Sequence, residues 1–89
     1  MSVSRTVEVT NRRGLHARAS AKFVTLASAQ PIEVRVCKDG EAVTGTSIMG
    51  LMMLGAAKGD SITISAEGDG AEAVVDALCA LVEDKFGED

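Results

Sequence analysis

The chain has 89 residues, of which 46% are hydrophobic and only 2% aromatic, and its formal net charge is −4. This length suffices for a single compact domain, residues 1–89, with an aliphatic core. The acidic balance argues against binding bare nucleic acid, because neutralising phosphates requires clustered Lys and Arg.

A strand and a helix are expected first. Over residues 3–9, valines alternate with mostly polar residues, with one interruption at Arg5, which predicts a strand with an apolar face. Residues 17–28 contain good helix formers and predict a helix that ends before Pro31, because proline cannot continue it. Its core-facing stripe is expected to contain Ala17, Ala21, Phe23, Val24 and Ala27.

A hairpin is expected next. Residues 31–39, PIEVRVCKD, alternate apolar and polar side chains and predict the clearest strand of the chain. Asp39-Gly40 is a hairpin dipeptide, since Gly readily adopts φ > 0, and a short return strand follows over 41–44. This turn predicts at least one antiparallel pair.

An unusual helix is expected over 48–54. Ser47 stands at its N-cap position, and a phosphate there would charge the edge of whatever surface the helix exposes. No face of this helix carries a polar side chain, and a two-layer domain can bury only one side of it. Leu51 and Leu54 are the better core candidates. We expect the other large side chains to form an exposed patch for partner proteins: Ile48, Met49, Met52 and Met53.

A strand and a helix complete the chain. Residues 61–68 alternate again and predict the last strand. The final helix is expected to start at Asp69 or Gly70, where Asp69 and Glu72 resemble a capping box. Its apolar side is expected to contain Val74, Val75, Leu78, Leu81, Val82 and Phe86.

The order of elements, βαββαβα, predicts an α+β fold of two layers, with helices on one face of the sheet and solvent on the other. Met1 leads directly into a strand without a secretory signal, and no apolar run approaches the ~20 residues that span a bilayer. Cys37 and Cys79 show no metal-ligand spacing and are expected to be free thiols. We therefore expect a soluble cytoplasmic protein that binds no metal, cofactor or membrane.

His16, the only histidine, lies at the start of the 17–28 helix. The first N–H groups of that helix, at Ala17 and Arg18, lack partners within it, and the helix dipole there favours phosphate and disfavours a protonated ring. Arg18 adds a guanidinium that can pair with phosphate oxygens, and Gly14 permits a tight bend. These residues predict a histidine that accepts a phosphoryl group reversibly, and an ordinary capping histidine is the alternative.

Three segments closely resemble one protein family. GLHARASA at 14–21, TSIMGLMMLGAAKGD at 46–60 and SITISAEGDGAEAVVDAL at 61–78 are similar to HPr, the histidine-containing phosphocarrier of the bacterial phosphotransferase system. The resemblance covers essentially the whole chain. It implies an open-faced β-sandwich in which a four-stranded antiparallel sheet of order 1-4-2-3 is covered on one face by three helices.

The resemblance also implies roles for particular residues. His16 would take a phosphoryl group on Nδ1 from enzyme I, which phosphoenolpyruvate charges, and pass it to a histidine of an enzyme IIA protein. Arg18 and the Ala17 N–H would contact the phosphate, and Ser47 would be the site of the ATP-dependent HPr kinase/phosphorylase. The chain would be a carrier and not a true enzyme, and a monomer suits a carrier that diffuses between partners. Partner docking is expected at Leu15, Ile48, Met49, Met52 and Met53.

One departure from the family pattern and one resemblance to a branch of the family are also present. Ala19 stands where the family usually has proline, which would preset the first helical turn, although alanine is still a good helix former. The Met-rich patch, with Gly50 where enteric sugar carriers commonly have a charged residue, resembles the nitrogen-related branch, NPr, which is regulatory. The alternatives are a purely regulatory binding protein controlled through Ser47 and an unrelated structural domain with a capped helix.

Overall fold

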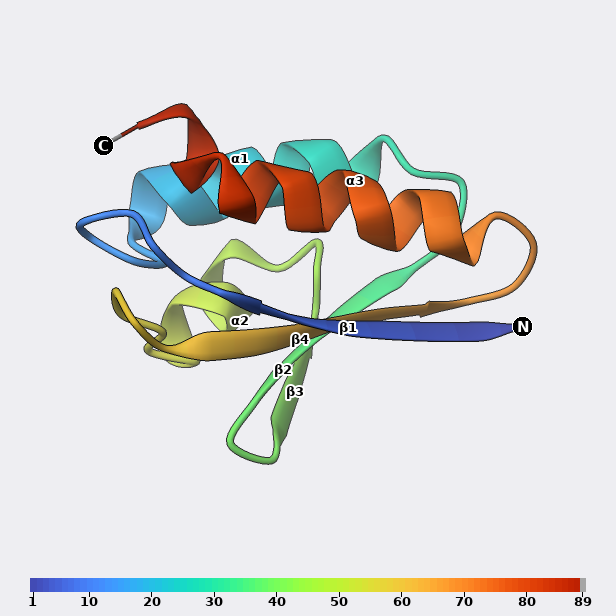
Figure 1. Ribbon diagram of the computed structural model, residues 1–89, viewed down its shortest axis with the longest axis horizontal. Helices are drawn as coiled ribbons and strands as arrows, with labels where there is room; N and C mark the ends of the chain where they lie inside the picture. The colour runs from blue at the N-terminus through green and yellow to red at the C-terminus, as the bar shows by residue number, and fades with distance from the viewer. Residues whose placement is uncertain (89) are drawn as a thin grey trace.

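The structure, a computed structural model, describes residues 1–88. Within this span the strands form one antiparallel sheet of order β1-β4-β2-β3, which confirms the expected order 1-4-2-3. Figure 1 shows α1 and α3 side by side over one face of the sheet, as expected of an open-faced sandwich. The elements are β1 (Ser2–Glu8), α1 (Ala17–Ser28), β2 (Val34–Lys38), β3 (Glu41–Thr44), α2 (Ile48–Met53), β4 (Ser61–Glu67), α3 (Ala71–Glu83) and a short turn, η1 (Lys85–Gly87).

The register of the sheet places apolar side chains on the covered face. Ile64 in the central strand β4 lies opposite Arg5 in β1 and Val36 in β2. Ile64 and Val36 are fully buried, whereas Thr63 and Ser65, its neighbours along β4, belong to the opposite face because successive side chains alternate. The core therefore lies between this face of the sheet and the helices.

Arg5 interrupts the apolar face of β1 for a structural reason. Its guanidinium pairs with the carboxylate of Asp76 on α3, and both side chains are about half exposed. The pair lies at the edge where α3 packs against β1, so that the charge reaches solvent. A pair this exposed is screened by solvent and adds little to stability.

The expected stripe of α1 is partly wrong. Ala17 is exposed, and Ala21 and Val24 are only partly buried. The polar residue Ser20 is buried instead, because its hydroxyl donates to the Leu15 carbonyl oxygen at 3.2 Å and so has a partner. The residues that α1 buries are Ala19, Ser20, Phe23 and Ala27.

The capping box expected at the start of α3 is also wrong. Gly70 occupies the N-cap with φ 83°, a left-handed conformation, and no side chain caps this helix. Asp69 therefore lies one residue too early to act as the cap. The expected apolar side of α3 is otherwise largely buried, with Leu81 at its margin and Phe86 in the turn that follows.

After α3 the chain reverses through three consecutive residues with positive φ: Lys85, Phe86 and Gly87, at 58°, 55° and 73°. A left-handed conformation costs roughly 1–2 kcal/mol for each residue with a side chain. Burying the side chain of Phe86, which is 1% exposed, returns about 1.5–3 kcal/mol. Burial of Phe86 therefore roughly offsets the backbone strain of Lys85 and Phe86. The other contacts of the turn are then needed to stabilise it.

Along residues 1–88 no helix is both long and apolar enough to cross a membrane. In the same span no three His, Cys, Asp or Glu side chains are grouped so that they could hold a metal ion. Cys37 and Cys79 are free thiols, as expected, with Cys37 half-buried and Cys79 buried.

Candidate functional site

The loop between β1 and α1 is tied to the loop between α2 and β4. The Val9 N–H donates to the Asp60 carbonyl oxygen at 2.8 Å, and the Leu15 N–H donates to the Ala56 carbonyl oxygen at 2.9 Å. Gly14 adopts φ 62°, and a Cβ there would collide with the Ala56 carbonyl. Only glycine permits this close approach, which fixes the backbone just before His16.

His16 is the N-cap of α1. Its backbone is extended, with φ −73° and ψ 179°, and its carbonyl oxygen accepts the first helical bond, from the Ser20 N–H at 2.9 Å. Its Nδ1 atom accepts a hydrogen bond from the Arg18 N–H at 3.3 Å. The ring therefore aims the lone pair of Nδ1 at the N–H groups of the first turn, which lack partners within the helix and of which Ala17 supplies the first.

The other ring nitrogen contacts the C-terminal end of the chain. His16 Nε2 lies 2.8 Å from Glu88 Oε1, and the two side chains are 21% and 20% exposed. Because Nδ1 accepts from a backbone N–H, the proton of the neutral ring is assigned to Nε2, which donates it to the carboxylate. The hydrogen bond with His16 is the main reason that the pKa of Glu88 is lowered.

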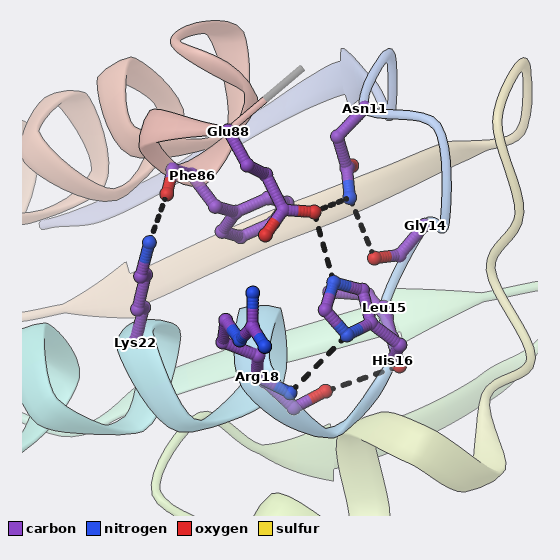
Figure 2. Close-up of polar contacts among 9 residues, drawn as sticks. Asn11, Gly14, Leu15, His16, Arg18, Lys22, Phe86 and Glu88 are labelled. Atoms are coloured by element: carbon purple, nitrogen blue, oxygen red, sulfur yellow. Dashed lines mark hydrogen bonds and ion pairs between the residues drawn. The ribbon is translucent and has the colours of Figure 1, made fainter.

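Asn11 connects the loop to Glu88, as Figure 2 shows. Its fully buried Nδ2 donates to the Gly14 carbonyl oxygen at 2.8 Å and to Glu88 Oε1 at 3.1 Å. Both partners are acceptors, so the orientation of the amide is settled. The bond from Asn11 is the second cause of the lowered pKa of Glu88.

Three arginines surround this ring. Arg12, Arg13 and Arg18 line a shallow open hollow of about 250 Å³ together with His16 and Glu88. Clustered guanidinium groups in a chain of net charge −4 give this end of the molecule a local attraction for anions. The arrangement suits transient binding of a phosphoryl group at Nδ1.

Ser47 is the N-cap of α2, as expected. Its Oγ accepts a hydrogen bond from the Gly50 N–H at 2.9 Å, and the residue is half-buried. Modification of this hydroxyl stays a prediction.

The helix α2 exposes a patch of large apolar side chains. Leu51 and Leu54 are buried, as expected of the core-facing side. The other four large side chains are exposed to solvent, with exposed fractions of 42%, 71%, 43% and 75% for Ile48, Met49, Met52 and Met53. We define these four residues as the α2 patch. Its exposure is confirmed, and its role in docking stays a prediction.

Leu15 is a correction to the expected docking surface. Its side chain is 4% exposed and belongs to the hydrophobic core, so it is not available to a partner. The loop bond from Leu15 to Ala56 turns the residue inward. Leu15 therefore packs in the core next to the site and is not part of the docking surface.

Four residues of the site were not predicted from the sequence: Asn11, Arg12, Arg13 and Glu88. Asn11 stands in the loop before His16, and a buried asparagine next to a left-handed glycine is a recognisable loop feature. Glu88 gives no such signal, because it lies 72 positions from His16 and reaches the ring only through the left-handed turn.

Comparison with known proteins gives consistent matches. A family model described as "PTS HPr component phosphorylation site" matches residues 3–84. The chain is 41% identical to the phosphocarrier protein HPr of Cupriavidus necator, over 97% of each chain. It is 40% identical to the phosphocarrier protein NPr of Shewanella violacea, over 97% of this chain and 94% of that protein. The crystal structure of HPr-C-His from Thermoanaerobacter tengcongensis has a TM-score of 0.91 and 45% identity, covering 98% of each chain.

Proposed function

Since the chain belongs to the HPr family of phosphocarrier proteins of the phosphotransferase system, we propose that its carrier residue is His16, which receives a phosphoryl group from enzyme I. His16 then passes the group to a histidine of an enzyme IIA protein. The observation that supports this most directly is the orientation of the ring, with Nδ1 toward the start of α1 and Nε2 on Glu88.

The transfer step needs no proton movement. The Arg18 N–H first releases the lone pair of His16 Nδ1 and so becomes available to a phosphoryl oxygen. That lone pair forms the new bond to phosphorus while the bond between phosphorus and the donor atom breaks, and the donor keeps that electron pair. The proton stays on Nε2, so the phosphorylated ring carries a positive charge that the Glu88 carboxylate balances. The reverse sequence of bonds delivers the group to the acceptor.

The phosphoryl oxygens would lie among hydrogen-bond donors and positive charge. The N–H groups of Ala17 and Arg18 belong to the first turn of α1, where the helix dipole favours an anion. The Arg18 guanidinium adds a charged donor in the same hollow. Because these groups are placed before the reaction, little reorganisation accompanies transfer.

Docking is assigned to the α2 patch. Flexible methionines can adapt to the different surfaces of enzyme I, an enzyme IIA protein and HPr kinase/phosphorylase. Ser47 at the edge of that patch is the proposed regulatory site, since an added phosphate would charge the docking surface. The Met-rich patch also favours the nitrogen-related branch, and the near-equal identities to an HPr and an NPr are compatible with either branch.

In this proposal residues 1–89 act as one HPr domain, a monomeric carrier in the cytoplasm and not a turnover catalyst. A diffusing carrier must meet several partners with the same surface, which favours a monomer. The alternative is a purely regulatory binding protein that works through Ser47 alone.

Phosphate mapping tests the proposal. The protein is incubated with enzyme I and phosphoenolpyruvate, and separately with ATP and HPr kinase/phosphorylase. We expect acid-labile phosphate on His16 in the first reaction and stable phosphate on Ser47 in the second. His16→Ala should lose only the labile label and Ser47→Ala only the stable one, so that each variant is the control for the other. Stable label on Ser47 without any labile label would favour the regulatory alternative.

A further inference from the structure

Lys22 connects α1 to the C-terminal turn. It lies one helical turn after Arg18 on the same side of α1, and Figure 2 shows its side chain extended toward Phe86. Lys22 Nζ donates a hydrogen bond to the Phe86 carbonyl oxygen at 2.8 Å, across a partly buried contact. This bond joins residues 64 positions apart in the chain.

The carbonyl that accepts from Lys22 belongs to the turn that leads to Glu88. It lies between Phe86 and Gly87, both left-handed, and Glu88 follows directly. The backbone bonds of the turn are local, from Gly87 N–H to Asp84 O and from Glu88 N–H to Lys85 O. They shape the turn but do not attach it to α1.

The charge of Lys22 also favours the ionised form of Glu88. Lys22 is one of the causes of the lowered pKa of that carboxyl, after the hydrogen bonds from His16 and Asn11. The ammonium group therefore acts on Glu88 in two ways, through the bond to the preceding backbone and through its charge.

We propose that Lys22 is a positioning residue that keeps the Glu88 carboxylate on His16 Nε2 by anchoring the left-handed C-terminal turn to α1. Lys22 touches neither ring nitrogen, so its effect passes through the turn. When Glu88 leaves Nε2, nothing in the turn holds the proton on that nitrogen. The Arg18 N–H on Nδ1 is then left to favour the proton on Nε2 without Glu88, so the tautomer with its proton on Nδ1 becomes more populated and the lone pair at Nδ1 is present for a smaller fraction of the time.

The consequence for phosphoryl transfer rests on the proposed function, whereas the consequence for the ring does not. Two measurements therefore separate them. The first is nitrogen NMR of the ring in ¹⁵N-labelled protein, which reports the nitrogen that carries the proton and needs no partner. The second is the rate at which phosphorylated enzyme I labels the protein.

The variant Lys22→Met removes the donor and the charge but keeps an apolar stem of similar length. We expect a mixed-tautomer ring spectrum and labelling slower by about fivefold, the factor that one hydrogen bond of ordinary strength accounts for. Lys22→Arg keeps a charged donor and should restore both. Lys58→Met, at an exposed lysine of the turn before β4, is the matched control and should match the wild type in both measurements.

Glu88→Ala supplies a second route to the same state. It removes the acceptor that Lys22 keeps in place, so its ring spectrum should match that of Lys22→Met even if the latter is less stable to urea. A wild-type ring spectrum in Lys22→Met overturns the inference, whether or not labelling slows. Slower labelling with a wild-type ring would instead indicate that Lys22 contacts the docked partner. If the wild-type protein accepts no phosphate on His16, the proposed function fails, and the ring spectra still decide the role of Lys22.

Discussion

The two regions on which the proposed carrier role depends are built on opposite principles. At His16, hydrogen bonds with Glu88 and the Arg18 N–H orient one side chain that is only 21% exposed, and Asn11 in turn donates to Glu88. The α2 patch has no such network, and its methionines lie open to solvent. Bond formation requires a fixed lone pair, whereas docking several partners requires side chains that can change shape.

The two regions are nevertheless joined. The Leu15 N–H binds the Ala56 carbonyl in the loop after α2, and α1 packs against α2. The α2 patch and the His16 site are therefore connected through the backbone of these two loops and through the packing of α1 on α2. Substitutions that alter one region at a time test how far this division holds.

The largest effect is expected where the rigid region tolerates no extra atom. Gly14→Ala combines a left-handed φ of 62° with a collision against Ala56, so we expect a loss of about 2–4 kcal/mol in the free energy of unfolding. Gly55→Ala is the matched control, since Gly55 has φ 67° but nothing within 4 Å of the added Cβ, and should lose about 1 kcal/mol. Urea denaturation measures both, and equal losses would show that the close approach contributes nothing.

A smaller effect is expected in the adaptable region. Met49→Glu places a charge on a side chain that is 71% exposed, so the free energy of unfolding should change by no more than about 0.5 kcal/mol. Binding to enzyme I should weaken by about tenfold, because a charge in an apolar interface core is unfavourable. Titration calorimetry measures the affinity, with Ala73→Glu on the exposed side of α3 as the charge-matched control. Unfolding of Met49→Glu would mean that the patch belongs to the core.

The smallest effect concerns pH. The pKa of Glu88 lies below its ordinary value of 4.5, mainly because of the hydrogen bond with His16. A carboxyl with a lower pKa in the folded chain adds stability above its unfolded pKa and loses it as the pH falls through the folded pKa. The wild type should therefore exceed Glu88→Gln in stability above pH 4.5, and this difference should shrink below it. Urea denaturation across pH tests this, with Glu33→Gln before β2 as the control. A difference that does not vary with pH would contradict the coupling.

Local patterns were sufficient for the elements of the fold but not for the contacts that complete the site. Alternation and capping predicted the strands, the Ser47 N-cap and the exposed side of α2, because each depends on neighbours in the chain. The burial of Ser20 and Leu15 accompanies hydrogen bonds that the loop before α1 makes with α1 and with the loop after α2, and periodicity does not describe these bonds. Glu88 could not be predicted, because it reaches the ring through a left-handed turn whose Phe86 carbonyl accepts a hydrogen bond from Lys22 in a distant helix.

The reversal of the chain after α3 has a practical consequence for labelling. Glu88 lies on the ring of His16, so a fluorophore or affinity peptide attached beyond it would start at the mouth of the site. The N-terminus lies at the opposite end of the molecule, where Met1 is 89% exposed (Figure 1). Fusions for kinetic work on this chain therefore belong at its N-terminus.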